Sequence, residues 1–325
     1  MTEISIKGGG LMEWLEAIGH AAAALAFALL VVVTIRRRRK LTRTLSRHAT
    51  IAYQALLVIS STMTLIHGYH AIDTLWLGNA RSSSDLLYVA LHSPAMVAMS
   101  VLLLFITSVK LVAERSLHPR RILAIGAHPD DLEIACGATL AKMRDAGHEV
   151  YAMVLTCGEV GGDPATRLQE AHDSAAFLDV NQVEVLNFND TTLAKQVNEI
   201  TRAIELRIRA YKPDIILTHS AHDQHQDHLT VHWATLRAAR NHSAILCYES
   251  PSVTRDFQPT FFVDIDGYLD VKIESVRTHA DQHGKPYVSP ERVRGVAIFR
   301  GGQAKTRYAE RFEVVRALSS ALGEI

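Results

Sequence analysis

Two short stretches of the sequence carry histidine and aspartate at spacings typical of metal chemistry. The side chains in question are His128, Asp130 and Asp131 in "AHPDD", and His225, Asp227 and His228 at the end of "THSAHDQHQDH". Each stretch follows a short apolar run that predicts a buried strand. Imidazole together with carboxylate suits zinc, and catalytic zinc sites use three protein ligands with one position left open.

The residue types suggest a division of roles between these side chains. His128, Asp131 and His228 would make a ligand set of two histidines and one aspartate. A metal held there lowers the pKa of its bound water and polarises a carbonyl. Asp130 is then suited to act as general base, and His225 to stabilise the oxyanion or protonate the leaving amine.

Other residues of the two stretches have structural interpretations. Asp227 is expected to hold the imidazole of His225 in its orientation. Pro-Asp is common turn chemistry, and Asp131 could instead cap a helix. Two such motifs after two strands of one α/β layer favour the metal site. We expect His219 and His222 to line the site or cap its loop.

Alternating strands and helices must position these residues from Arg121 onward. Strands are predicted at 122–127, 149–156, 183–188, 214–218 and 244–248, and helices at 133–146, 165–178, 195–211 and 227–239. This order predicts an α/β fold with a Rossmann-like, doubly wound and mostly parallel sheet covered on both faces. Sites in such sheets form at the carboxyl ends of the strands. The first strand is not followed by the G-x-G-x-x-G loop of dinucleotide-binding proteins.

The zero net charge of the 325-residue chain conceals two different halves. Residues 1–121 carry 13 Lys and Arg against 6 Asp and Glu, so the remaining residues carry a net charge of −7. Three widely spaced cysteines without a C-x-x-C pair indicate a reducing compartment and no disulfide framework.

The basic half contains three uncharged stretches, which predict an all-α transmembrane region. The stretches are 17–35, 50–72 and 86–109. A bilayer core needs about 20 apolar residues in a helix, so each can span it. A signal peptide is the alternative for the first stretch, and a buried amphipathic helix is the alternative for the second. We therefore expect a membrane region over 1–116 and a second domain over 117–325.

The positive charge of the loops between the predicted spans predicts how the chain is oriented in the membrane. Residues 36–49 hold seven Lys and Arg, whereas 73–85 holds one. Because positive loops stay in the cytoplasm, the N-terminus is expected outside and the second domain in the cytoplasm, at the cell inner membrane. The "RRRRK" cluster abuts an apolar helix, so it is more simply a topology signal than a nucleic-acid site. We therefore expect no nucleic-acid partner.

The motif pair "AHPDD" and "HxDH" resembles the PIG-L, LmbE-like family of zinc-dependent N-acetylglucosaminyl deacetylases. The stretches 155–180, 261–282 and 308–316 also resemble that family. By position, the resemblance implies that His128, Asp131 and His228 are the metal ligands. It also implies that Asp130 is the general base and that His225 stabilises the transition state, and Asp227 matches the acid between the two histidines. It further implies that Arg167 contacts substrate. Gln226 stands where the family usually has proline, and the acid after the Asp pair is one place later, at Glu133.

Two more side chains are candidate substrate contacts. Glu159, in the Gly-rich stretch after the second strand, could reach a substrate hydroxyl or belong to a flexible turn. Asp190 follows the third strand and could line the cleft or cap a helix.

The sequence thus predicts a membrane-anchored hydrolase. The enzyme would use Zn²⁺, or Fe²⁺ or another divalent ion in the cell, to remove an N-acetyl group from an amino sugar through metal-activated water. The amino-sugar substrate rests on the resemblance. Because the predicted helices anchor the enzyme, membrane lipid is an expected partner, and a lipid-linked amino sugar is a candidate substrate. The alternatives are an amidohydrolase for another N-acyl substrate and a membrane-tethered, non-catalytic binding protein.

Overall fold

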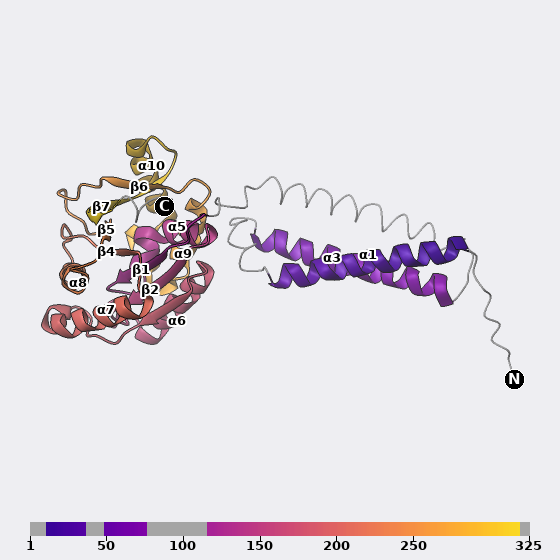
Figure 1. The fold of residues 1–325 in the computed structure, drawn as a ribbon, viewed down its shortest axis with the longest axis horizontal. Helices are drawn as coiled ribbons and strands as arrows, with labels where there is room; N and C mark the ends of the chain where they lie inside the picture. Colours follow the sequence, from indigo (N-terminus) through magenta and orange to yellow (C-terminus); the bar gives the residue numbers. More distant parts are fainter. Residues whose placement is uncertain (1–10, 37–48, 77–115, 319–325) are drawn as a thin grey trace. The chain divides into compact units, whose positions relative to one another are not determined.

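The computed structural model describes residues 11–36, 49–76 and 116–318. The chain divides into two compact units, Met1–Leu111 and Val112–Ile325. In the first unit, helices α1 (Leu11–Arg36) and α3 (Ala49–Trp76) pack against each other (Figure 1).

By length and composition alone, Ala17–Arg36 and Tyr53–Thr74 can cross a membrane. Core helices of soluble proteins and signal sequences meet the same criterion, so this finding does not by itself establish a membrane protein. The third predicted span, 86–109, lies outside the described residues.

The second unit is built on a mixed seven-stranded sheet with the order β3-β2-β1-β4-β5-β7-β6. The strands are β1 (Arg121–Gly126), β2 (Glu149–Val154), β3 (Gln182–Val185), β4 (Ile215–His219), β5 (Ala244–Tyr248), β6 (Phe261–Asp264) and β7 (Ala309–Ala317). The first five are parallel to one another, and β7 is antiparallel to both β5 and β6. The α/β fold class agrees with the prediction.

Helices cover both faces of this sheet (Figure 1). They are α5 (Asp131–Asp145), α6 (Pro164–Phe177), α7 (Val197–Tyr211), α8 (Gln226–Ala238), α9 (Leu269–Arg277) and α10 (Pro290–Ala304), with short 3₁₀ turns η2 (Leu193–Gln196), η3 (Ala280–Gln282) and η4 (Pro286–Val288). Apolar residues of α5, α9 and α10 form one core cluster with one face of the sheet, and those of α7 and α8 form a second cluster with the other. The two apolar faces account for the nearly continuous apolar strands in the sequence.

The order of the strands reverses between β1 and β4. The chain runs from β1 outward to β2 and β3, and then returns to place β4 on the other side of β1, with Ala124 opposite Leu217. The carboxyl ends of these two neighbouring strands form the topological switch point, where α/β sheets bind ligands. Both polar stretches therefore begin at the same place in the fold.

Helix α5 is kinked at Cys136, whose φ and ψ of −138° and 20° are not helical. Glu310 of β7 accepts hydrogen bonds from the freed N–H groups of Ala138 (3.2 Å) and Thr139 (2.7 Å). The Lys272 ammonium of α9 donates to the carbonyl of Ala135 at 3.0 Å and pairs with Glu310 at 2.5 Å. The kink is thus stabilised by side chains from elements that our sequence analysis did not predict, namely α9 and β7.

We expect Lys272→Met to lower the free energy of unfolding by about 3–5 kcal/mol, because it leaves the Glu310 carboxylate buried without its cation. Lys272 and Glu310 are only 4% and 1% exposed, so water cannot replace the lost partner. Urea titration of the full chain in detergent, followed by thiol labelling of buried Cys247, measures the loss.

A matched control is the ion pair between Arg294 and Asp270, whose side chains are 41% and 50% exposed. Arg294→Met should cost less than about 1 kcal/mol. The double variant Lys272→Met/Glu310→Gln should lose less stability than the two single losses together. Equal effects of Lys272→Met and Arg294→Met would contradict this account of the kink.

Candidate metal centre

The turn after β1 is organised around the carboxylate of Asp131. Its Oδ2 atom accepts hydrogen bonds from the backbone N–H groups of Ala127 (2.9 Å) and His128 (2.7 Å). These bonds start α5 at Asp131, two residues before the predicted start. The carboxylate thereby closes the tight turn, and Oδ1 lies 3.2 Å from Nε2 of His228.

The second polar stretch leads from β4 into α8 and supplies His228. Nδ1 of His228 lies 2.9 Å from Oδ2 of Asp223. Asp223 is in turn held by the hydroxyls of Ser250 (2.5 Å) and Ser252 (2.6 Å) and by the N–H of His225 (2.9 Å). A carboxylate behind a metal-binding histidine fixes its ring and raises its basicity. Our sequence analysis missed Asp223, although its position two residues before His225 in "HDQHQDH" was a possible signal.

The three predicted ligands, His128, Asp131 and His228, come together with ligand atoms within 4.8 Å of one another. Nε2 of His228 lies 3.4 Å from Nδ1 of His128 as well as 3.2 Å from Oδ1 of Asp131. Tetrahedral zinc with ligand bonds of about 2.0–2.1 Å separates its ligand atoms by about 3.3 Å. The residues therefore fit a zinc-sized divalent ion.

Two other sets of three side chains meet the same distance criterion and share a histidine with the first. They are His128, His225 and Asp227, and His219, Asp223 and His228. Backbone N–H groups already donate to Nδ1 of His225 and Nε2 of His219, so neither atom is available to a metal in this arrangement. In the predicted set, the facing atoms Nδ1 of His128 and Nε2 of His228 accept no hydrogen bond from the backbone of the described residues.

His128 also has carboxylates behind it. Its Nε2 atom lies 3.0 Å from Oδ1 of Asp190 and 3.4 Å from Oδ2 of Asp227. Burial alone would lower the pKa of His128, but its hydrogen bonds to Asp131, Asp190 and Asp227 outweigh this and raise the pKa. Asp190 was predicted to contact substrate or cap a helix, and in the structure it lines the cavity and holds His128.

The same balance applies to His228. Burial would lower its pKa, whereas the neighbouring carboxylates of Asp131 and Asp223 raise the pKa to about 9. Both histidine ligands are thus surrounded by negative charge, which also favours a divalent cation over an empty site.

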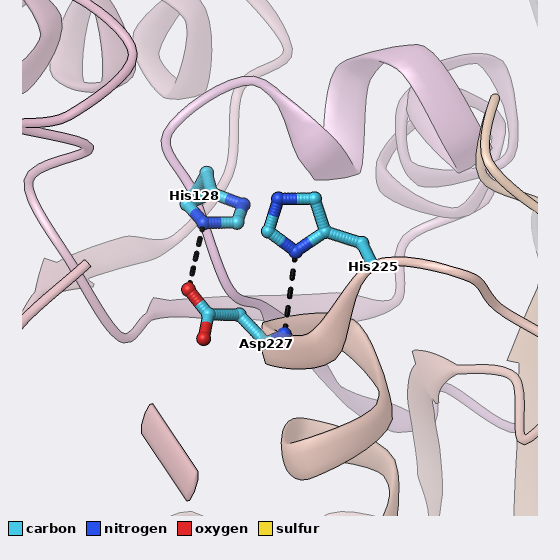
Figure 2. Close-up of side chains that lie close together, drawn as sticks. All are labelled: His128, His225 and Asp227. Atoms are coloured by element: carbon cyan, nitrogen blue, oxygen red, sulfur yellow. Dashed lines mark hydrogen bonds and ion pairs between the residues drawn. The ribbon is translucent and has the colours of Figure 1, made fainter. Parts of the chain in front are cut away.

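Asp227 contacts His225 differently from the prediction (Figure 2). Its backbone N–H donates to Nδ1 of His225 at 3.3 Å, whereas its carboxylate accepts from the N–H groups of Thr191 (2.6 Å) and Leu193 (3.2 Å). The predicted carboxylate contact is replaced by a backbone contact, because His225 is the N-cap residue of α8. Since Nδ1 accepts, Nε2 is the protonated nitrogen of a neutral ring. Burial and the nearby His228 and His128 lower the pKa of His225, in agreement with a neutral ring.

Arg167, predicted to contact substrate, is engaged within the protein. It is 3% exposed, and its guanidinium donates to Oδ1 of Asp130 at 2.9 Å and to the carbonyl of Gly158 at 2.8 Å. Arg167 therefore positions Asp130 while also lining the cavity. Glu159, the other predicted substrate contact, is exposed and accepts from the N–H of Asp190 at 2.7 Å, and it does not line this cavity.

His219 and His222, which were expected to line the site or cap its loop, make contacts within the protein and do not line the cavity. Nε2 of His219 lies 3.2 Å from Asp131, and its ring stacks on His228 at 3.9 Å. His222 pairs with Glu313 at 2.9 Å. Gln226 leaves the ligands in place, and its amide donates to the carbonyl of Thr191 at 3.4 Å.

All of the predicted catalytic and ligand side chains except Asp227 line one cavity of about 340 Å³. Asp227 is fully buried beneath it. Lys285 and Tyr287, from the segment that includes η4, also line this cavity and were not among the predicted site residues. The cavity therefore places the candidate metal ligands beside a carboxylate, Asp130, and a further imidazole, His225.

Comparison with known proteins gives a consistent result. The profile of the family described as "PIG-L: GlcNAc-PI de-N-acetylase" matches residues 123–239. The uncharacterized deacetylase YaiS of Escherichia coli is 38% identical over 165 residues, which cover 49% of this chain and 89% of that protein. The diacetylchitobiose deacetylase of Thermococcus kodakarensis is 29% identical over 223 residues, covering 59% and 81%.

A solved structure of a conserved protein from Thermus thermophilus shares the fold, with a TM-score of 0.56 and 24% identity over 61% of this chain and 96% of that one. The matched profile spans both polar stretches and all three candidate ligands. From the profile match and the near-complete coverage of the Escherichia coli relative, we conclude that the chain belongs to the PIG-L, LmbE-like family.

Proposed function

We propose that this protein is a zinc-dependent hydrolase that removes the N-acetyl group from an amino sugar. Its relatives are deacetylases, which supports a hydrolase acting on an amide C–N bond. The observation that carries the proposal is the convergence of His128, Asp131 and His228 in one cavity with Asp130 and His225.

The metal would be held by His128, Asp131 and His228, with Fe²⁺ or another divalent ion as alternatives to Zn²⁺ in the cell. When bound, such an ion polarises the acyl carbonyl and lowers the pKa of a water molecule. Asp190 and Asp223 orient the two imidazoles from behind through the contacts of 3.0 Å and 2.9 Å described above.

The protein's own groups would then move the protons. Asp130, held by Arg167, accepts a proton from the attacking water as its oxygen bonds to the acyl carbon. His225 donates a hydrogen bond through Nε2–H to the acyl oxygen as negative charge develops there. The C–N bond breaks when the leaving nitrogen receives a proton from Asp130, and the products are acetate and a free amine.

An N-acetylated amino sugar is the substrate class that the relatives favour. The curated relatives include the diacetylchitobiose deacetylase and a 1D-myo-inositol 2-acetamido-2-deoxy-alpha-D-glucopyranoside deacetylase of Thermomonospora curvata, the latter 30% identical over 154 residues. Both names describe an acetamido sugar in a conjugate. We extend that substrate class to this chain.

We also propose that the chain is an integral membrane protein with its hydrolase domain in the cytoplasm. Two apolar helices of sufficient length and the positive charge at 36–49 support this placement. Membrane lipid is then a partner, and a lipid-linked substrate in the same membrane would lie close to the enzyme.

Zinc titration and acetate release should separate the roles of the site residues in the full chain. His228→Ala should abolish stoichiometric zinc binding, because it removes one of three ligands. Asp223→Asn should weaken zinc binding about 10- to 100-fold by loosening His228. Asp130→Asn should bind zinc normally but release acetate from an N-acetylglucosamine conjugate about 100- to 10,000-fold more slowly.

His222→Gln is the matched control, since His222 belongs to the same loop but pairs with Glu313 at the surface. It should keep both zinc and activity. Full activity of the His228→Ala variant without metal would contradict the mechanism. Zinc binding with release only from N-acetylated peptides would instead favour the alternative amidohydrolase, and zinc binding without hydrolysis of any acyl compound would favour a binding protein.

Cell fractionation tests the proposed localisation. The full chain should stay in the membrane pellet after alkaline carbonate extraction. This treatment breaks electrostatic contacts with the membrane, but it does not extract apolar helices from the bilayer. Protease added to intact spheroplasts should leave the hydrolase domain uncut, and protease added after lysis should cut it. Release by carbonate, or cleavage of the domain in intact spheroplasts, would show the placement to be wrong.

A further inference from the structure

A second cavity of about 260 Å³ adjoins the metal cavity. Ile134, Pro251 and Tyr287 line both, so the two hollows meet at these three side chains. Pockets for small molecules usually measure about 300–1,000 Å³, so the two together suit a conjugate better than either one alone. The second cavity is built largely from α10, β7 and the segment after β5, which lie outside the residues matched by the family profile.

The lining of the second cavity carries excess positive charge. Two guanidiniums bind the carboxylate of Glu249: Arg300, with contacts of 2.9 Å and 3.1 Å, and Arg311. Of these three side chains, Glu249 and Arg311 line the cavity and neutralise each other, whereas Arg300 does not line it. Lys272 and Glu310, which also line the cavity, neutralise each other.

Arg292, in the first turn of α10, supplies the excess positive charge of the lining. Its side chain lines the second cavity, and no hydrogen bond or ion pair joins its guanidinium to another residue within the described part of the chain. Lys285 lines the metal cavity, with its Nζ 6.0 Å from the centre of the Tyr287 ring. Each of the two cavities thus has a cation in its lining, and Tyr287 lines both.

A guanidinium binds phosphate and carboxylate groups through paired hydrogen bonds, and its positive charge makes a neutral partner less favourable. From this charge and position we propose that the second cavity binds an anionic group, a phosphate or a carboxylate, that is covalently attached to the amino sugar. The acetamido group would then occupy the metal cavity. This inference rests on the proposed function, and it specifies the substrate as an anionic amino-sugar conjugate.

Calorimetry on the full chain in detergent, loaded with zinc, tests binding apart from catalysis. The probes are glucosamine 1-phosphate, methyl glucosaminide, which lacks the anion, and inorganic phosphate alone. The wild type should bind the sugar phosphate about 10- to 100-fold more tightly than either of the others. Arg292→Ala should remove that preference, and Arg292→Lys should restore part of it.

Arg294→Ala is the control, because Arg294 pairs with Asp270 on the neighbouring helix α9 and does not line the cavity. It should bind all three probes as the wild type does. Equal affinity for the phosphorylated and the methylated sugar, or an unchanged preference in Arg292→Ala, would overturn the proposal. Binding of inorganic phosphate as tight as that of the sugar phosphate would also overturn it, since the site would then serve a free anion.

Acetate release from the N-acetylated forms of the two sugars reports on the proposed function separately. Arg292→Ala should lower kcat/KM for the phosphorylated form about 10- to 100-fold, mainly through KM, and leave the methyl glycoside within about twofold. If no substrate released acetate, the proposed function would be contradicted. The preference for the sugar phosphate measured by calorimetry would still show whether the second cavity binds an anionic group.

Discussion

The buried carboxylate of Asp131 is the constraint on which the rest of the site depends. One of its oxygens accepts two backbone N–H groups and thereby fixes the turn that carries His128. The other oxygen lies against His228, which comes from a different strand and helix. A buried carboxylate is costly unless it is fully paired, so the turn, the start of α5 and the second histidine must all be in place together. The same contacts that form the turn after β1 therefore also bring the candidate ligands together.

The sheet makes this convergence possible, because β1 and β4 are neighbours that are far apart in sequence. Their carboxyl ends supply the ligands, and the later elements complete the surroundings. Glu310 and Lys272, from β7 and α9, stabilise the kink of α5, while α10 and η4 extend the ligand cavity with a positively charged wall. The candidate ligands thus lie in the matched segment 123–239, whereas most of the lining of the second cavity lies beyond it.

The sequence predicted the parallel strands and the convergence of His128, Asp131 and His228 because these depend on local signals: apolar runs, helical spacing and two motifs at strand ends. It did not predict contacts that depend on side-chain direction. Asp227 was expected to hold the imidazole of His225, and in the structure its backbone N–H makes that contact. Arg167 was expected to contact substrate, and its pairing with Asp130 was not foreseen. Asp223 was missed although it lies two residues before His225, because its contact with Nδ1 of His228 depends on side-chain direction. The antiparallel strands β6 and β7 lack the regular strand–helix alternation that identified the others.

The most direct test of the central claim is X-ray absorption at the zinc edge on the zinc-loaded full chain. The account predicts one zinc per chain bound by two imidazoles and additional oxygen ligands, with zinc–nitrogen distances of about 2.0–2.1 Å and no sulfur. The imidazole signal should fall by half in any His228→Ala protein that can be forced to take up zinc. A sulfur ligand, or an imidazole signal unaffected by that substitution, would contradict a metal centre formed by His128, Asp131 and His228.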